Sequence, residues 1–342
     1  MRSICVSAWK SRCTFRIVDH LVELKARAGR GLFIGTVKIR VLGSAAGGGF
    51  PQWNCNCRNC SGVRSGTVRT SPRTQSSIVV GGNTADEFVL INASPDILSQ
   101  LKSFEQLQPA RQIRDTALKS IVLVDGQIDH TTGLFMLREA RAPWPIWCTP
   151  AVHRDLTDGN PILKVLDHYC GIEWNPVDLS DAWFEVKGAE GVRWKAFNLS
   201  SKPAPFSPNR AKPIPGDNIG LFLEDQSTHR KLFYAPGLGG VDDKVWEYMR
   251  AADCVLVDGT FWAEDEMLAL GLSSKFARDM GHLPQSGAGG MIEWLDRLPS
   301  STRKVLIHIN NSNPILDEDS TQRADLRDHG IEVAYDGMEI EP

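Results

Sequence analysis

The segment IVLVDGQIDHTTGL, at residues 121–134, decides how this chain folds. Its first four residues are apolar and mostly β-branched, a pattern that predicts a fully buried strand. Four polar side chains follow almost at once: Asp125, Gln127, Asp129 and His130. Functional side chains often lie in the loops that a rigid sheet positions. The segment therefore predicts a buried strand whose end carries a candidate metal site.

The composition is that of an ordinary globular protein, with 42% hydrophobic and 23% charged residues in a chain of 342. This length allows one large α/β domain or two smaller ones. No apolar run reaches the roughly 18 residues needed to cross a bilayer. The net charge of -3 gives no general attraction to nucleic acid. Neither a membrane nor a nucleic acid is therefore expected as a partner.

Residues 1–36 differ from the rest of the chain because basic residues outnumber acidic ones there. Their short apolar stretches lack the apolar core and small-residue cleavage site of a signal peptide. A targeting peptide is one interpretation; we favour a non-homologous N-terminal extension, followed by a single domain over residues 37–342. Without a clear signal peptide, the expected location is cytoplasmic.

From Val37 onward the sequence first favours strands and then alternates strands with helices. Apolar and β-branched runs predict strands at residues 38–43, 75–80, 88–92, 120–124, 193–198, 219–223, 231–234, 255–257 and 305–309. Apolar positions three and four residues apart predict helices at residues 95–104, 131–140, 242–251, 264–270 and 287–298. The proline-rich segment 201–217 should form a loop that lines a site, because each proline removes a backbone donor and restricts its predecessor.

Three of the eight cysteines, Cys55, Cys57 and Cys60, lie within six residues, and the others are scattered. This spacing favours a metal site over a disulfide framework. Zinc takes four tetrahedral ligands and binds cysteine sulfur readily, so a fourth ligand must come from elsewhere. The alternative is three free thiols, which would be prone to oxidation. The glycine-rich turn at residues 43–49 lacks the GK[ST] ending of a phosphate loop and indicates a tight turn or a site rim.

Two further histidines follow an apolar strand or a glycine turn. His308 ends a β-branched run, where an unpaired polar ring is costly unless it has a partner. His282 lies in the segment GHLPQSG, and Asp258 follows an apolar strand and precedes glycine, as Asp125 does. A structural histidine and a turn carboxylate are the alternative interpretations of His308 and Asp258.

Six motifs over the region from Val37 to the C-terminus carry a family resemblance: VKIRVLGSAAGGGFPQWNCNC, DGQIDH, FYAPGL, DGTFW, GHLPQSG and HINNSNP. Together they resemble the coenzyme PQQ synthesis protein B family of the metallo-β-lactamase superfamily. The resemblance implies an α/β fold of the αββα sandwich type, in which two mixed β-sheets lie face to face with helices outside.

The chain departs from the hydrolases of this superfamily at several ligand positions. Their motif is HxHxDH, and Asp125 and Gln127 stand where its two leading histidines would be. Ala235 and Pro236 stand where a bridging aspartate is expected, and the loop after Asn198 supplies no histidine. A hydrolase with two metal ions needs about seven ligands. At most one of the two metal positions is therefore expected to remain.

The resemblance implies an active-site metal held by Asp129, His130 and His308. Two histidines and one carboxylate are the ligands of non-haem iron(II) oxygenases. We expect the other candidates around this metal, with Asp258 as a further ligand and, as catalytic residues, His282, Asp125 and Gln127. In a related phosphodiesterase with a similar zinc cluster, the fourth ligand lies three residues after the last catalytic histidine. That place is occupied here by Asn311, a poor zinc ligand.

The resemblance also implies the activity, an Fe(II)-dependent hydroxylation of the tyrosine ring of a cross-linked Glu-Tyr precursor in PQQ biosynthesis. Fe(II) is expected in the active site and structural Zn(II) at the cysteines. The expected partners are this small-molecule precursor and other proteins of the PQQ pathway, and a homodimer stays open. Residues 203–217, with Trp53 and Trp262, would shape an aromatic pocket, although tryptophan more often belongs to a core.

Two other functions compete with the oxygenase. One is a carrier that takes PQQ or its precursor towards the periplasm, which would bind without turnover. The other is a metal-dependent hydrolase of phosphodiesters or esters, which the replaced ligands argue against.

Overall fold

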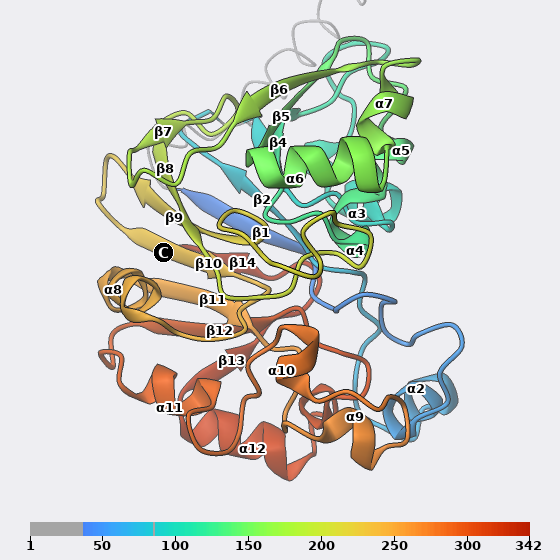
Figure 1. Ribbon diagram of the computed structural model, residues 1–342, viewed down its shortest axis with the longest axis vertical. Coiled ribbons are helices and arrows are strands. Elements are labelled where there is room, and N and C mark those ends of the chain that lie inside the picture. The colour runs from blue at the N-terminus through green and yellow to red at the C-terminus, as the bar shows by residue number, and fades with distance from the viewer. Residues whose placement is uncertain (1–36, 85) are drawn as a thin grey trace, which may run out of the picture. The chain divides into compact units, whose positions relative to one another are not determined.

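The apolar runs of the sequence become the strands of two mixed β-sheets. The structure, a computed structural model, describes residues 37–84 and 86–342, so the predicted extension at residues 1–36 lies outside the described residues. Figure 1 shows the two sheets packed together, with helices on the outer side of each. The expected αββα sandwich is confirmed.

Seven strands of the described chain form the first sheet, in the order β14-β1-β2-β3-β4-β5-β6. Neighbours from β14 to β3 pair antiparallel, and neighbours from β3 to β6 pair parallel. The bounds are β1 Lys38–Gly43, β2 Ser77–Gly81, β3 Phe88–Ile91, β4 Leu118–Val122, β5 Trp144–Cys148, β6 Ile172–Pro176 and β14 Glu339–Ile340.

The second sheet repeats this pattern with seven strands of the described chain, in the order β13-β12-β11-β10-β9-β8-β7. Pairs from β7 to β10 are antiparallel, and those from β10 to β13 are parallel. The bounds are β7 Phe184–Glu185, β8 Val192–Asn198, β9 Ile219–Asp225, β10 Lys231–Ala235, β11 Cys254–Asp258, β12 Arg303–Ile307 and β13 Ile331–Val333. Single β-bridges, such as Asp125 with Asn218, join the two sheets at the edge where the site lies.

The core between the sheets consists of side chains that alternate along the strands. Ile39, Val80 and Ile91 from the first sheet belong to one buried cluster with Trp194 and Tyr234 from the second. Both faces of the inner strands are apolar, because helices cover the outer faces as well. The strand ends are therefore fixed by packing on both sides, which holds the functional side chains in place.

Helices cover both outer faces (Figure 1). On the first sheet lie α3 Ile97–Ser103, α5 Gly133–Met136, α6 Pro150–Arg154 and α7 Ile162–Leu166. On the second lie α8 Asp243–Ala251, α11 Met291–Asp296 and α12 Thr321–Asp328. The remaining helices are α2 Arg58–Ser65, α4 Ile128–Thr131, α9 Glu266–Ala269, α10 Ala277–Met280 and the short η1 Glu105–Leu107, η2 Asp155–Gly159 and η3 Pro314–Leu316. None of the helices in the described residues is long and apolar enough to span a membrane.

All of the predicted strands occur, with ends that differ by at most two residues. The predictions missed β5, which contains Pro145, and the short or partly polar strands β6, β7, β13 and β14. The proline-rich segment 201–217 is a loop, as predicted.

The predicted helix at residues 131–140 is wrong in its bounds, because the chain forms α4 and α5 instead. Gly133 explains the break between them. A Cβ atom there would lie 2.2 Å from the backbone oxygen of Ser94, so the chain packs against a neighbouring segment at this point. The consequence is that Asp129 and His130 lie within the one-turn helix α4.

Candidate metal centres

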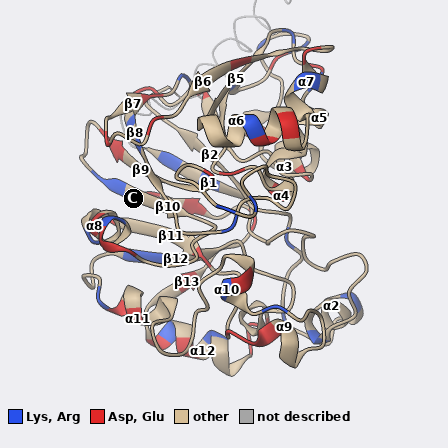
Figure 2. Cartoon of the chain, in the orientation of Figure 1, with Lys and Arg blue, Asp and Glu red and all other residues tan. Residues whose placement is uncertain are grey.

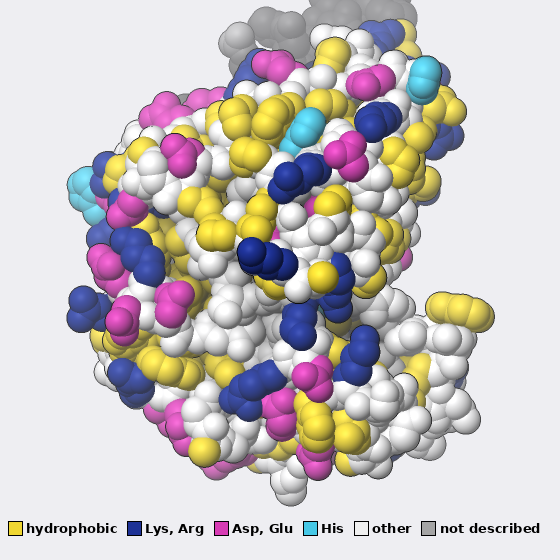
Figure 3. All heavy atoms as spheres, viewed as in Figure 1, with side chains coloured by type: hydrophobic (Ala, Val, Ile, Leu, Met, Phe, Trp, Pro, Cys, Tyr) yellow, Lys and Arg dark blue, Asp and Glu magenta, His cyan; other side chains and the backbone are white. Residues whose placement is uncertain are grey.

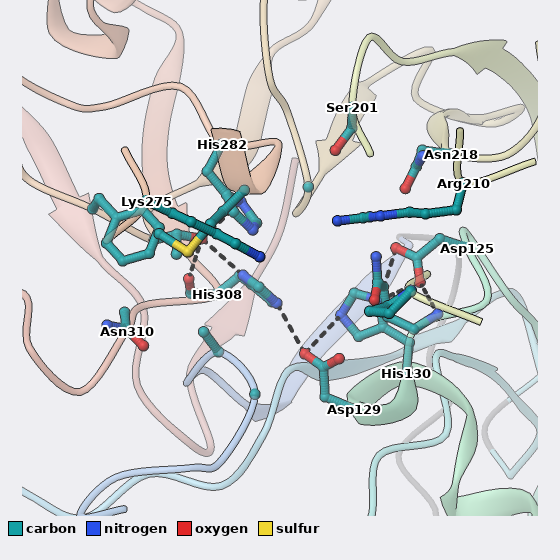
Figure 4. Close-up of a pocket in the computed structure, with 18 residues that line it drawn as sticks. Asp125, Asp129, His130, Ser201, Arg210, Asn218, Lys275, His282, His308 and Asn310 are labelled. Carbon is teal, nitrogen blue, oxygen red and sulfur yellow. Dashed lines mark hydrogen bonds and ion pairs between the residues drawn. The ribbon is translucent and has the colours of Figure 1, made fainter. Parts of the chain in front are cut away.

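A cavity of about 250 Å³ opens at the edge where the two sheets meet. Asp125 and α4 form one side of it, and the segments after β11 and β12 form the other. Figure 4 shows the side chains converging on its floor. The lining residues that the sequence singled out are Asp125, Gln127, Asp129, His130, His282 and His308. These candidates come from distant parts of the sequence, and the fold brings them together.

The local sequence places His130 by means of a short turn. The carboxylate of Asp125 accepts the backbone N–H of Gln127 at 2.9 Å, and α4 begins one residue later. The same carboxylate receives Nδ1 of His130 at 2.8 and 2.9 Å from its two oxygens. Because this contact fixes the Nδ1 proton, Nε2 of His130 is free to bind a metal. Nε2 is buried and has no hydrogen-bond partner among the described residues, as expected for an atom suited to bind a metal.

The second imidazole arrives from the other sheet. His308 follows β12 with a positive φ of 61°, a backbone conformation that residues other than glycine rarely adopt. Its Nδ1 lies 2.9 Å from the hydroxyl oxygen of Thr260, which leaves Nε2 free. That Nε2 lies 3.2 Å from Oδ2 of Asp129, and Nε2 of His130 lies 3.8 Å from the same oxygen. Three ligand atoms thus surround one point.

The charges of these groups depend on one another. Burial would lower the pKa of His130, but the nearby carboxylates of Asp125 and Asp129 outweigh it and raise this pKa to about 9. Burial would raise the pKa of Asp129, but the neighbouring His130 and His308 hold it well below its usual range. Without a metal ion, Asp129 is therefore ionised beside a protonated imidazole, and a divalent cation would replace that proton.

Asp258 and His282 form a second carboxylate and imidazole pair. Nδ1 of His282 lies 2.6 Å from Oδ2 of Asp258, which is fully buried. The same Oδ2 accepts the backbone N–H of Leu238, and Oδ1 accepts both the N–H and the hydroxyl of Thr260. Burial would lower the pKa of His282, but the Asp258 charge outweighs it and raises this pKa. Asp258 thus lies behind His282 and does not line the cavity.

Two groups of three side chains at this edge have ligand atoms within 4.8 Å of one another. One is Asp129, His130 and His308, and the other is Asp258, His282 and His308. His308 belongs to both. The first group fits a divalent ion well, because each histidine has a fixed Nδ1 and the carboxylate faces both Nε2 atoms. In the second group, hydrogen bonds already engage both oxygens of Asp258.

Gln127 ties α4 to the proline-rich loop. Its side-chain amide donates to the backbone oxygen of Lys202 at 3.2 Å, and it also lines the cavity. The expected pocket wall is only partly found, because Pro205 and Arg210 of the segment 203–217 line the cavity and the two tryptophans do not. Phe261 lines the cavity, whereas Trp53 is 86% exposed and Trp262 packs against the core of the second sheet. The predicted roles of Trp53 and Trp262 are therefore wrong, because the turn carrying Trp53 directs the ring to solvent.

The cysteine cluster lies apart from this cavity, at the start of α2. The side-chain amide of Asn311 lies 3.1, 3.7 and 3.4 Å from the sulfurs of Cys55, Cys57 and Cys60. Burial raises the pKa of Cys60 to about 11, so its thiolate needs a bound cation. Three thiols around one point fit a zinc ion. An amide turned by half a rotation would present oxygen instead of nitrogen to the same point, so Asn311 can complete the tetrahedron.

Several lining residues were missed by the sequence predictions, notably Thr260 and Lys275, whereas Arg210 belongs to the proline-rich loop that was predicted to line a site. Thr260 lies in the quoted DGTFW motif, so its neighbour Asp258 was a usable signal. Lys275 lies in a segment without periodicity, and no local pattern places it at a site.

Comparisons with known proteins identify the family to which the chain belongs. The family model described as the beta-lactamase superfamily domain matches residues 87–309, so the chain belongs to this superfamily. The solved structure of zinc-bound PqqB from Methylobacterium extorquens has 32% identity and a TM-score of 0.80, and the match covers 89% of this chain and 100% of that one. A diphosphatase of the PhnP family, with 18% identity and a TM-score of 0.62 over 90% and 97% of the two chains, shares the fold.

Sequence relatives are still more similar. The coenzyme PQQ synthesis protein B of Azoarcus sp. (strain BH72) is 63% identical, over 88% of this chain and 99% of the relative. That of Cupriavidus taiwanensis is 60% identical, over 88% and 98%. The chain belongs to the coenzyme PQQ synthesis protein B family.

Proposed function

We propose that this protein acts in PQQ synthesis as an iron-dependent hydroxylase of the tyrosine ring of a cross-linked Glu-Tyr precursor. Membership of the coenzyme PQQ synthesis protein B family supports the pathway. Zinc in the related PqqB structure supports metal binding, and the choice of iron rests on the ligand set.

One observation carries the proposal. Asp129, His130 and His308 present three ligand atoms to one point, and this is the ligand set of non-haem iron(II) oxygenases. The positions expected to hold the other ion of a hydrolase carry Asp125 and Gln127 instead, and they do different work. Asp125 orients His130, and Gln127 ties the proline-rich loop to α4.

The surrounding residues keep the ligands in one orientation. Asp125 fixes Nδ1 of His130, and Thr260 fixes Nδ1 of His308, so both Nε2 atoms face Asp129. Iron(II) bound there would activate oxygen for insertion into an aromatic ring. Asp258 holds His282 at the cavity wall, where this imidazole can take up or deliver a proton. We assign to Asp258 the orientation of His282 and not direct metal binding.

The test uses purified protein that has been loaded anaerobically with Fe(II). This protein is then mixed with the precursor, ascorbate as reductant and labelled oxygen gas. For each hydroxylation, one labelled oxygen atom should enter a ring C–H bond, and the other should leave as water with two electrons from ascorbate. Asp129→Ala should abolish this product, and Asp328→Ala, which changes an exposed carboxylate on α12, should leave it unchanged. An unchanged precursor that binds tightly would contradict the proposal and favour the carrier.

A metal-dependent hydrolase is the second candidate, because Asp258, His282 and His308 form a second possible metal group. Its test uses zinc or manganese in place of iron and a phosphodiester in place of the precursor. We expect no hydrolysis above that of Asp129→Ala, since hydrogen bonds already occupy the oxygens of Asp258.

A further inference from the structure

Two basic side chains face the cavity from opposite sides. Arg210 comes from the proline-rich loop, and Lys275 comes from the segment between α9 and α10. Figure 4 shows both reaching over the metal-ligand cluster, Arg210 above His130 and Lys275 above His308. Figure 2 shows basic residues on the loops between the two sheets, and Figure 3 shows Lys and Arg side chains around the hollow on this face. The mouth of the cavity is therefore basic.

Neither Arg210 nor Lys275 forms a salt bridge with any described residue, although neighbouring basic residues do. Arg278, three residues after Lys275, pairs with Glu264 at 2.5 Å. One guanidinium N–H of Arg210 donates a hydrogen bond to the backbone oxygen of Pro203, which orients the group without neutralising its charge. The remaining guanidinium donors and the Lys275 ammonium are available to a ligand.

The cavity floor does not need these two positive charges. Asp125 and Asp129 contribute two negative charges to the lining, and one divalent metal ion balances them. Asp258 is buried behind His282 and does not line the cavity. A metal-loaded floor is therefore neutral, and Arg210 and Lys275 leave a charge of about +2 at the mouth that a bound molecule can compensate.

We propose that Arg210 and Lys275 anchor two carboxylates of a small substrate that carries at least two, one on each side of the metal centre. A guanidinium can hold a carboxylate through two parallel hydrogen bonds, and an ammonium acts as a point charge. Anchoring both ends would hold the middle of the molecule above Asp129, His130 and His308. The identity of the substrate as the Glu-Tyr precursor rests on the proposed function, whereas the dicarboxylate preference does not.

The test measures binding of glutarate to the zinc-loaded protein by calorimetry, so that no turnover is needed. Glutarate should bind at least tenfold more tightly than butyrate, and its neutral analogue glutaramide should not bind. Arg210→Ala and Lys275→Ala should each weaken glutarate binding at least tenfold, and Arg210→Lys should restore part of it. Lys212→Ala is the matched control, because it removes an exposed charge of the same loop outside the cavity lining.

Three results would overturn the proposal. Wild-type glutarate affinity in Arg210→Ala and Lys275→Ala would show that the carboxylates bind the metal directly. Tighter binding of inorganic phosphate than of glutarate would make this a phosphate site. An equal loss of glutarate affinity in Lys212→Ala would show that general charge attraction, and not a specific site, accounts for the binding. If the two variants lose glutarate binding but the wild-type protein does not hydroxylate the precursor, the proposed function alone is contradicted. The anchoring by Arg210 and Lys275 would then stand.

Discussion

The two halves of the molecule, one built on each sheet, orient a histidine of the cavity in nearly the same way. In each half, an Asp-Gly pair lies at or just after the end of a buried parallel strand, and the aspartate fixes Nδ1 of a histidine in the cavity. In the first half the pair is Asp125 and His130, and in the second it is Asp258 and His282. The difference is that α4 adds Asp129, a carboxylate aimed at two imidazoles, whereas the described residues of the second half add no carboxylate to the cavity lining. The first half therefore supplies two ligands, Asp129 and His130, and His308 of the second half completes the set. The Asp258 and His282 pair can instead orient a proton donor or acceptor.

The largest effect should separate the two halves directly. Asp129→Ala removes the carboxylate ligand and should lower metal affinity more than about 100-fold, beyond the usual effect of a residue that only orients a ligand. His282→Ala should keep the metal and lose turnover. Metal content after dialysis, measured by elemental analysis, checks the metal in both variants, and the hydroxylation assay checks turnover. Equal metal loss in Asp129→Ala and His282→Ala would contradict the assignment of Asp129 as a ligand and His282 as a proton donor or acceptor.

The two orienting aspartates should differ in what they stabilise. Asp125→Ala should lower metal affinity about 10- to 100-fold, because His130 loses the group that fixes its ring. Asp258→Ala should instead destabilise the metal-free fold, since the buried N–H groups of Leu238 and Thr260 lose their acceptor at about 1–3 kcal/mol each. Urea unfolding of the metal-free variants measures this difference. A larger loss of stability in Asp125→Ala would reverse the assignment.

Metal binding at Asp129, His130 and His308 should depend on pH. Because the pKa of His130 is raised to about 9, the metal-free site holds a proton below that pH, and the ion must displace it. Affinity should therefore fall by about tenfold for each pH unit below 9. In Asp125→Asn, which lacks one of the charges that raise this pKa, the fall should begin at a lower pH. Titrations with a competing chelator would show this, and a flat profile from pH 9 to 6 would contradict it.

The smallest effect concerns the glycine-rich turn against Asp129. A Cβ atom at Gly47 would lie 3.3 Å from the Asp129 carboxylate, so Gly47→Ala should displace this ligand by a few tenths of an ångström. We expect a several-fold loss of metal affinity. Gly240→Ala is the control, since its Cβ would meet nothing within 4 Å. Identical affinities in both variants would show that the turn does not position Asp129.

The sequence predicted the parts of this comparison that depend on local pattern. Apolar runs located β4, β11 and β12, and the polar residues after them marked Asp129, His130, Asp258 and His308. Resemblance to a family then supplied the ligand set. The break between α4 and α5 was missed because it depends on contact between Gly133 and the backbone of Ser94.

The sequence did not reveal which aspartates bind and which orient. Asp125 and Asp258 look alike as strand-end residues, and only the hydrogen bonds show that each holds an imidazole. Lys275 and the role of Arg210 within the proline-rich loop were missed for a similar reason, because the fold brings these two irregular segments to one cavity. Long-range geometry of this kind leaves no periodic trace in the chain.

The most direct test of the central claim, that one ion lies between Asp129, His130 and His308 and none between Asp258, His282 and His308, is anomalous diffraction from crystals loaded anaerobically with Fe(II). The account predicts a single iron peak in the cavity, bounded by Asp129, His130 and His308, with a separate zinc peak among Cys55, Cys57 and Cys60. A second metal peak between Asp258, His282 and His308 would contradict it and return the protein to the two-metal chemistry of the hydrolases.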